Sequence, residues 1–462
     1  MHFLRKTLFF ILLNLVGYFQ LISQDNLIVS KINLHGNNIT KEYIIYRELL
    51  FQLGQNIDKF DLETLVQNSE NNLLNTSLFN FATISYLIDN TNVEIDIDVQ
   101  ERWYIWPYPV LEHADRNFSS FLNNQEWSRI DYGLFVLVNN FRGRKEILKI
   151  KSIFGFNKSY SLSYYKPYLN KKQKIGLGLE FNYIKNKEVA FKIMGDELQY
   201  LKLGNTYGRE KIDGTLFLTY RPQIYLEHLG AIQYNSISIE DSLFKLNEEY
   251  FYNKEKSINY FSLIYNFDYD KRDSKVYPLK GFRVSSSLVK KGLGLYETSG
   301  PFYILSILEK NNQLSKKFYF NTSIEGKYSF NNLNSFYFSQ AIGYDNYLRG
   351  MEFYVSNGSN YYISKSNLKL EIIPQTNINL KFLQSKKFSK AHYALYANLF
   401  FDSGYVDSNT EIKSCLSNEF LYSGGIGIDF VTYYDKVLRI EYSMNKFGEH
   451  GIFFHLGAPI IE

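Results

Sequence analysis

Arg349 and Gly350 stand side by side in the long connection between two expected strands, 318–327 and 361–372. The planar guanidinium of an arginine can form two parallel hydrogen bonds to a carboxylate, which fix its orientation as well as its position. Glycine allows the tight backbone course that a loop tip requires. For such a pair taken alone, an ordinary solvated loop arginine is the favoured interpretation, and a loop anchored on an acidic residue is the alternative.

Few other residues could carry out catalysis. The seven histidines are scattered, and no two of them have the spacing of metal ligands. The chain also lacks the Gly-x-Ser-x-Gly elbow of hydrolases and a glycine-rich phosphate loop. His392 and His455 have no associated nucleophile, and single histidines in a barrel are usually structural. We therefore expect no enzyme activity, no metal and no cofactor.

The composition is typical of a β-barrel. Basic and acidic residues nearly balance, at 51 and 47 with a net charge of +4, and no long run of one sign supports nucleic-acid binding. Aromatic residues make up 18% of the chain, with 40 tyrosines and 38 phenylalanines. No apolar segment beyond the N-terminus could form a spanning helix. Barrel strands need an apolar residue only at every second position, where they face lipid.

From about residue 128 to residue 462 the chain is a succession of alternating segments separated by polar turns. One such segment places its apolar side chains at Ile175, Leu177, Leu179, Phe181 and Tyr183. The segments run for about ten residues, the length of a tilted spanning strand. A soluble β-protein would also alternate, but with many short strands. We therefore predict an antiparallel transmembrane barrel.

The alternating segments number sixteen or seventeen. Single-chain bacterial barrels have even numbers of strands, so sixteen is the prediction, and one segment between Lys187 and Asn205 is suspected to lie outside the count. Only a closed sheet satisfies every backbone group in lipid, so we also expect the barrel to be closed.

Residues 1–24 have the features of a signal peptide. Arg5 and Lys6 precede a mostly apolar stretch, 7–19, and the acidic Asp25 follows the expected cleavage region. A membrane anchor is the alternative, but the apolar stretch is shorter than the ~20 residues of a spanning helix. Cys415 is the only cysteine, so no disulfide can form within the chain, and no lipid-bearing cysteine follows the signal. We expect an exported protein that is not a lipoprotein.

Residues 25–103 mix strand and helix patterns in the order β-α-α-β-β, which predicts a small α+β domain. Thr40 is expected to cap the first helix, because its hydroxyl can accept a hydrogen bond from an early backbone N–H. Residues 104–127, with two prolines and several aromatic rings, are expected to be a stiff linker. Their rings would equally suit a membrane interface, where tryptophan and tyrosine are enriched.

Three motifs in the N-terminal domain resemble the polypeptide-transport-associated (POTRA) domain. They are Ile32-x-Leu34-x-Gly36-Asn37, Leu73-Leu74-Asn75-x-x-Leu78-Phe79 and Val99-Gln100-Glu101-Arg102-Trp103. The resemblance implies one POTRA domain in the periplasm that docks partners by strand addition to an exposed sheet edge. An unrelated two-layer α+β domain is the alternative.

The loop motif Leu348-Arg349-Gly350-Met351 resembles the Val-Arg-Gly-Phe/Tyr motif in the sixth extracellular loop of BamA-type barrels, the bacterial surface antigens. In that family the loop folds back into the lumen, and its arginine pairs with an acidic residue on a nearby strand. Phe401-Asp402-Ser403-Gly404 matches the family's Phe-Asp-x-Gly motif, so the resemblance implies that Asp402 is the partner of Arg349. Glu371, which is expected to face inward, is a second candidate.

Two further stretches extend this resemblance over essentially the whole mature chain. Residues 269–273 with Pro278 and Gly281 are similar to a Tyr-Asp-x-Arg-Asp turn, and residues 424–430, which include Gly425 and Gly427, are similar to the closing strands. The C-terminus departs from the pattern, because the residues after 456 do not end on an aromatic side chain.

The resemblance implies a factor that assembles, inserts or translocates proteins at the bacterial outer membrane. Its partners would be outer-membrane lipids, unfolded outer-membrane or secreted client proteins, and periplasmic accessory proteins. The alternatives are a passive pore or structural barrel, and dedicated secretion of one partner protein.

Overall fold

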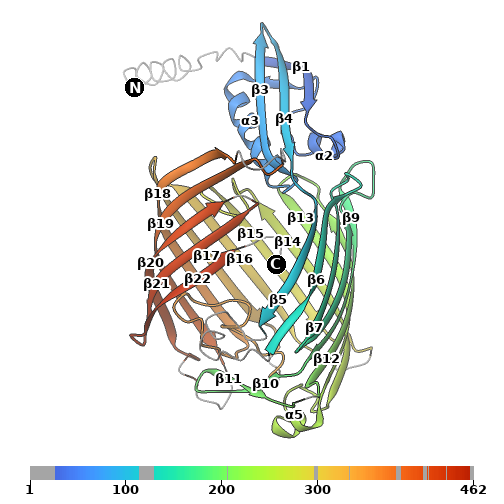
Figure 1. The fold of residues 1–462 in the computed structure, drawn as a ribbon, viewed down its shortest axis with the longest axis vertical. Helices are drawn as coiled ribbons and strands as arrows, with labels where there is room; N and C mark the ends of the chain where they lie inside the picture. Colours follow the sequence, from blue (N-terminus) through green and yellow to red (C-terminus); the bar gives the residue numbers. More distant parts are fainter. Residues whose placement is uncertain are drawn as a thin grey trace, which may run out of the picture.

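In the computed structural model the chain forms a small N-terminal domain that stands on one end of a large barrel (Figure 1). The structure describes residues 26–457 except 114–128, 205, 296–299, 332, 334, 381–386, 409–413, 415 and 433. The expected signal peptide and the second half of the expected linker lie outside the described residues. The barrel end beneath the N-terminal domain is called the domain end below, and the opposite end the loop end.

The N-terminal domain packs two helices against one face of a four-stranded sheet with the order β2-β1-β4-β3. Its elements are β1 (Asn26–His35), α2 (Glu42–Tyr46), β2 (Asn56–Asp58), α3 (Lys59–Leu74), β3 (Phe79–Asp89) and β4 (Asn92–Glu101). Alternating residues Val93, Ile95 and Ile97 of β4 are fully buried and form the centre of the core. The expected element order is present, with the short edge strand β2 in addition.

Thr40 does not cap α2, so that expectation was wrong. The N-cap is Lys41, and no side chain caps the helix. The Thr40 hydroxyl instead lies 3.0 Å from the Tyr104 hydroxyl and accepts a hydrogen bond from the Asn140 amide at 2.8 Å. Because Tyr104 directly precedes the barrel and Asn140 lies near the end of its strand β6 (Ile130–Phe141), Thr40 joins the two parts of the molecule.

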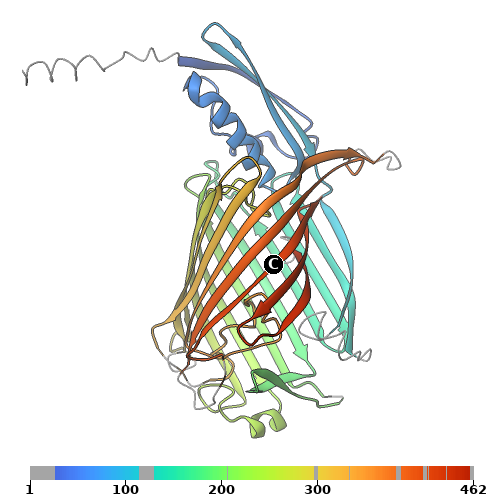
Figure 2. The same cartoon turned by 90° about the vertical axis from the view of Figure 1, so that its left-hand side faces the viewer.

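Among the described residues, sixteen strands form one antiparallel sheet, which confirms the predicted fold class and strand number. Apart from the crossing from β9 to β12, each strand pairs with the next along the chain (Figures 1 and 2). The strands are β5 (Ile105–His113), β6 (Ile130–Phe141), β7 (Glu146–Gly155), β8 (Lys158–Lys166), β9 (Ile175–Asn186), β12 (Arg209–Tyr220), β13 (Leu226–Ile239), β14 (Ser257–Asp270), β15 (Gly281–Lys291), β16 (Phe302–Gln313), β17 (Phe318–Ser329), β18 (Asn360–Asn379), β19 (Lys390–Asp407), β20 (Phe420–Thr432), β21 (Lys436–Asn445) and β22 (His450–Gly457).

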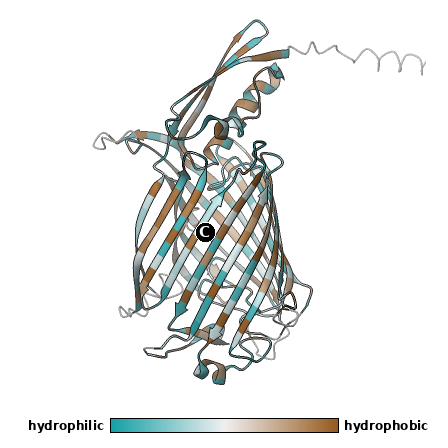
Figure 3. Cartoon of the chain, turned by 90° about the vertical axis from the view of Figure 1, so that its right-hand side faces the viewer, coloured by the Kyte–Doolittle hydropathy of each residue, from teal (hydrophilic) through white to brown (hydrophobic). Residues whose placement is uncertain are grey.

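The barrel has an apolar exterior and a polar interior, as the alternating colours of its strands indicate (Figure 3). On β19, Leu399 and Phe401 face outward and are 54% and 52% exposed. Asp402 on the same strand faces the lumen and is fully buried. Such a distribution is the reverse of a soluble core, and it matches a barrel whose outer face contacts lipid. In the described part of the chain, none of the helices is long and apolar enough to cross a membrane.

The expected boundary between the linker and the barrel requires correction. Residues 105–113, expected to belong to the linker, are β5, which pairs with β6 along its whole length. The prolines that suggested a linker are compatible with a strand at the edge of a sheet, where one side needs no N–H donors. The barrel therefore begins at Ile105 rather than near residue 128.

The suspected miscount between Lys187 and Asn205 also has a structural explanation. Residues 189–201 form a separate two-stranded hairpin, β10 (Val189–Met194) and β11 (Glu197–Leu201), at the loop end. This hairpin, α5 (Asp241–Leu246) and the residues that follow share a hydrophobic cluster. Its buried members include Val189, Ile237, Leu243, Tyr250, Phe251 and Ile258. The loop end is therefore covered by a small packed cap.

The expected backbone closure is not found. The described residues of β5 and β22 are the two ends of the sheet order, and no register joins them. Each of these strands has a paired side and a side without a strand partner. We call the boundary between them the seam.

Gly36 in the turn after β1 supports a specific prediction. Its φ is +87°, and a Cβ at this position would lie 1.9 Å from the carbonyl oxygen of Val99 on β4. Gly36→Ala should therefore destabilise the domain by roughly 1–3 kcal/mol beyond the cost of its backbone conformation, because the added atom overpacks the turn. Limited proteolysis of the full chain would measure the loss.

Gly54→Ala is the matched control for Gly36→Ala. Gly54 has a similar φ of +78°, but no atom lies within 4 Å of the position that a Cβ would take there. Equal protease sensitivity of the two variants would contradict the proposed role of the contact with β4.

Candidate functional site

The segment 330–359 connects β17 to β18, and we call it the plug loop, because inward-facing side chains of the barrel wall hold it in the lumen. These side chains come from β18, β19 and β21, three strands whose polar faces line the lumen. Arg349 lies near the middle of the plug loop and makes most of these contacts.

Arg349 forms a bidentate pair with Asp402. Its Nε and Nη2 donate to the two carboxylate oxygens at 2.9 and 2.5 Å, and its backbone N–H donates to the same carboxylate at 3.1 Å. Arg349 Nη1 also donates to Asn367 at 2.6 Å and to Glu441 at 3.1 Å. Arg349 is 4% exposed and Asp402 0% exposed. A buried charge of this kind is stable only when it is paired and hydrogen-bonded.

The closing-strand glycines leave space for this site. The Phe400 ring lies beneath the guanidinium, with the Arg349 Cζ 3.9 Å from the ring centroid. A Cβ on Gly425 would lie 2.8 Å from that ring, and a Cβ on Gly427 would lie 2.7 Å from Cγ of Glu441. Both glycines on β20 are therefore needed to admit the side chains that contact Arg349.

Gly350 and its neighbours fix the loop tip. Gly350 has a φ of +82°, and a Cβ there would lie 2.9 Å from the Ser443 hydroxyl oxygen on β21. Leu348 and Met351 are 0% and 2% exposed and belong to one hydrophobic cluster with Ile363 of β18. The motif thus combines one buried cation with two apolar anchors.

Glu371, the second expected partner, does not contact Arg349 in the described structure. It accepts a hydrogen bond from Tyr319 at 3.5 Å and pairs across the sheet with Tyr396. Glu441 was not expected and is the second carboxylate at the guanidinium. In the sequence, Glu441 alternates with the apolar residues Leu438 and Ile440, and this pattern predicts that its side chain faces the lumen. The pattern does not predict which segment lies opposite, and only the tertiary structure brings β21 and the plug loop together.

The plug loop also contacts the last strand. The Tyr347 hydroxyl lies 3.0 Å from Nδ1 of His455 on β22, and the two rings stack with their centroids 5.7 Å apart. Nε2 of His455 lies 3.6 Å from a carboxylate oxygen of Glu441 and 3.6 Å from one of Glu352. One side of the seam is therefore attached to the same loop that carries Arg349.

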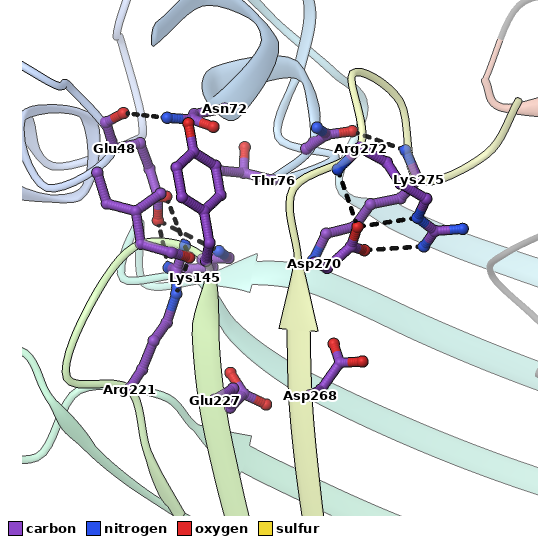
Figure 4. Close-up of a pocket in the computed structure, with 13 residues that line it drawn as sticks. Glu48, Asn72, Thr76, Lys145, Arg221, Glu227, Asp268, Asp270, Arg272 and Lys275 are labelled. Atoms are coloured by element: carbon purple, nitrogen blue, oxygen red, sulfur yellow. Dashed lines mark hydrogen bonds and ion pairs between the residues drawn. The ribbon is translucent and has the colours of Figure 1, made fainter. Parts of the chain in front are cut away.

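At the domain end, the N-terminal domain is held by ion pairs with the barrel turns (Figure 4). Glu48, which follows α2, is 1% exposed and accepts hydrogen bonds from Arg221 at 2.6 and 2.8 Å. Lys145 lies 3.7 Å from the same carboxylate. Burial alone would raise the pKa of Glu48, but the charges of Arg221 and Lys145 outweigh it and hold the pKa at about 2.

Other contacts attach the N-terminal domain to further turns at the domain end of the barrel. Asn75, after α3, donates to the backbone of Asp273 at 3.1 Å and accepts from Lys275 at 2.9 Å. Arg102 forms a bidentate pair with Asp435 in the turn between β20 and β21, with one bond of 2.9 Å. The domain therefore lies across the mouth of the lumen and touches turns on opposite sides of it.

The described residues contain no group of three or more histidine, cysteine, aspartate or glutamate side chains that could hold a metal ion. Several charged groups of the lumen and of the domain end are instead paired, among them Arg349 with Asp402 and Glu48 with Arg221.

Comparison with known proteins agrees with this architecture. The POTRA family model, described as "Surface antigen variable number repeat", matches residues 27–102. The barrel and domain together are similar to BamA from Haemophilus ducreyi lacking POTRA domains 1–3. That match has a TM-score of 0.51 and 16% identity, and it covers 93% of this chain and 84% of that one.

Residues 27–102 form a POTRA-like domain, and the barrel that follows has the BamA-type fold. CdiB from Escherichia coli is also similar, with a TM-score of 0.57, 9% identity and coverage of 93% of this chain and 76% of that one. CdiB from Acinetobacter baumannii gives a TM-score of 0.51 at 12% identity, with coverage of 94% and 74%. No curated protein matches the chain in sequence.

Removal of the guanidinium should destabilise the barrel. Arg349→Ala leaves Asp402 and Glu441 without their shared cation, and we expect a loss of about 3–5 kcal/mol, the usual cost of breaking a buried pair. Arg349→Lys should recover little of it, because an ammonium cannot form the bidentate contact. The temperature at which the folded band disappears in a gel-mobility assay measures the effect.

Arg283→Ala is the control for the arginine substitutions. Arg283 pairs with Asp268 at 2.7 Å, but the two side chains are about one-third exposed, at 31% and 32%. Its loss should change the transition little. Equal shifts for Arg283→Ala and Arg349→Ala would contradict the special position of the plug-loop pair.

The Glu48 contact predicts a pH dependence of domain docking. Because the folded-state pKa is lowered from 4.5 to about 2, the contribution of Glu48 is complete above about pH 4.5 and is lost as the pH falls toward 2. Glu48→Gln should loosen docking already at neutral pH. Amide hydrogen exchange in α2 would report this loosening, with Glu419→Gln as the control, because the Glu419 side chain is 61% exposed where it pairs with Lys446 near the loop end.

Proposed function

We propose that this chain is a non-enzymatic factor that assembles, inserts or translocates proteins at the bacterial outer membrane. The observation that carries the proposal is the seam, where two strand edges at membrane depth have no strand partner among the described residues. Such edges accept added strands, because their backbone groups have no water to bind in lipid. BamA and CdiB, which share the fold, agree with this assignment.

In this proposal the POTRA domain lies in the periplasm, after export by a cleaved signal peptide, and the apolar barrel face contacts outer-membrane lipids. Client segments would first add to β3, the longer free edge of the POTRA sheet. Tyr86, Leu87 and Ile88 near the end of β3 are 36%, 70% and 43% exposed, so this edge also offers apolar contacts. Periplasmic accessory proteins could use the same edge.

Function then requires rearrangement at the domain end. The POTRA domain covers the mouth of the lumen there, and the plug loop and the cap occupy the loop end. A client would therefore leave sideways through the seam rather than straight through the lumen. No nucleotide is involved, so the free energy comes from client folding and from burial of apolar surface in lipid.

The alternatives are a passive pore or structural barrel, and dedicated secretion of one partner. The closed ends of the barrel disfavour an open pore, whereas a single POTRA domain is compatible with secretion of one client. A client gene next to the gene for this chain would favour dedicated secretion.

Depletion of the protein in its native bacterium separates these functions. An assembly factor predicts at least a several-fold accumulation of unfolded barrel proteins in the periplasm, because they lose their route into the membrane. Quantitative mass spectrometry of membrane and periplasmic fractions measures this. Unchanged barrel proteins together with reduced uptake of small solutes would exclude the assembly function and support a pore.

A further inference from the structure

A cavity at the loop end of the barrel is separate from the Arg349 site and from the contacts of the POTRA domain. Its volume is about 310 Å³, and it is lined by the β10–β11 hairpin of the cap, by the adjoining ends of β9 and β12, and by the plug loop. The hairpin lies at the bottom of Figure 1. This volume is at the lower end of the range for sites that bind small molecules.

Aromatic rings form much of the cavity wall. Tyr200 of β11 is 41% exposed, and Tyr250, which follows α5, is 1% exposed. The rings of Phe336 and Tyr337 in the plug loop pack against Tyr250, with centroids 5.7 and 5.9 Å away. Tyr344 adds a fifth ring to the wall. Because Tyr250, Phe336 and Tyr337 belong to the packed cap, the wall offers a ligand apolar ring surfaces in set positions.

Asp345 of the plug loop supplies a carboxylate whose position is set by its two neighbours. The Tyr344 hydroxyl donates to the Asn357 side chain at 2.6 Å, and the Asn346 amide donates to Glu325 on β17 at 2.5 Å. The Asp345 side chain lines the cavity, is exposed and, within the described part of the chain, makes no hydrogen bond and no ion pair. Its carboxylate oxygens are therefore acceptors that a ligand can use.

Gln340 supplies an amide group in a similar way. Its backbone forms a bridge with Asn357, and its carbonyl accepts a hydrogen bond from Lys327 at 3.1 Å. Its side chain is exposed and has no hydrogen-bond partner among the residues that the structure describes. An amide both donates and accepts, so Gln340 and Asp345 together suit a ligand group that does the same, such as a hydroxyl.

The charged residues at the cavity disfavour a strongly charged ligand. Arg209 is held by the side-chain oxygen of Asn186, to which its Nη2 donates at 3.0 Å, and its charge is opposite to that of Asp345. Glu188 forms an ion pair with Arg129 at 2.7 Å. A purely apolar ligand is disfavoured as well, because it would remove the Asp345 carboxylate from water without giving it a partner.

We propose that this cavity binds a sugar residue of a glycan. A sugar ring has apolar C–H faces that can stack on the tyrosine rings, and hydroxyl groups that can donate to Asp345 and exchange hydrogen bonds with Gln340. The ring is also uncharged, in keeping with the balance of charges at the cavity. The inference rests on the proposed function for its orientation, because a POTRA domain in the periplasm places the loop end at the cell surface.

Binding is measured by saturation-transfer NMR on the purified full-length protein in an amine oxide detergent, which contains no sugar. The probes are the methyl glycosides of glucose, galactose, mannose and N-acetylglucosamine. We expect saturable binding of at least one probe, and Asp345→Asn should weaken it about tenfold, the equivalent of one hydrogen bond. Asp241→Asn is the matched control, because this exposed cap residue pairs with Lys256 and does not line the cavity.

The aromatic wall is tested by a second pair of variants. Tyr200→Ala should weaken binding several-fold, whereas Tyr200→Phe, which keeps the ring, should retain it. Gel mobility before and after heating checks that each variant is folded. Absence of saturable binding by the wild-type protein would overturn the proposal, as would equal binding by Asp345→Asn and Asp241→Asn.

Competition distinguishes the two sources of such a glycan. Displacement of the bound probe by polysaccharide from the outer membrane of the native bacterium indicates a ligand on the same cell. Displacement only by soluble polysaccharides, such as starch or dextran, indicates a ligand from outside. Both results support the sugar site.

A labelling experiment separates this proposal from the proposed function. In a Cys415→Ser background, Asp345→Cys is treated on whole cells with a maleimide that cannot cross membranes, and labelling is expected. Labelling only after permeabilisation, with sugar binding retained in detergent, would contradict the proposed orientation and overturn access from the cell surface. Failure of sugar binding, in contrast, would leave the depletion test of the assembly function unaffected.

Discussion

The burial of one positive charge constrains much of the barrel. A guanidinium removed from water requires compensating charge and hydrogen bonds on several sides at once. Arg349 obtains them from Asp402 on β19, Asn367 on β18 and Glu441 on β21, and Phe400 lies beneath it. These partners must converge within one lumen wall, so the glycines of β20 and the apolar anchors of the plug loop serve the same requirement. The loop stays in the lumen because its cation cannot leave without exposing these carboxylates.

The two ends of the sheet are held together by a different kind of contact. Most neighbouring strands share a full backbone ladder, whereas the seam is bridged at the domain end by Arg102 with Asp435 and by Trp106 with Tyr434. Side-chain contacts can be exchanged one at a time, but a ladder must break cooperatively. The POTRA domain, whose Glu48 is bound to Arg221, adds a second closure at the same end. The fold shared with BamA and CdiB thus carries the POTRA domain at one end and the plug loop and cap at the other, and the described residues of β5 and β22 share no backbone ladder.

The alternation of apolar and polar residues along the sequence predicted the fold better than it predicted the side-chain contacts between distant residues. The period of two residues identified the strands, and the even-number rule excluded the β10–β11 hairpin. The linker prediction at 105–113 failed because Pro107 and Pro109 argue against a strand unless it lies at an edge, and edges are defined only by the whole sheet. The pairing of Arg349 with Asp402 was implied by motif resemblance, but Glu441 was not, because alternation reveals which face a residue takes and not which strand lies across the lumen. The contact between Glu48 and Arg221 joins residues 173 positions apart and had no sequence signal.

Arg349 stabilises the barrel through its direct contacts with Asp402 and Glu441. A double-mutant cycle tests it most directly, with the free energies of unfolding in urea measured for the single and paired alanine variants at positions 349 and 402 and at positions 349 and 441. Contacting residues typically couple by about 0.5–3 kcal/mol, and the bidentate pair should lie in the upper part of this range, with the Glu441 pair below it. Additive effects at both pairs, with no coupling energy, would contradict the account.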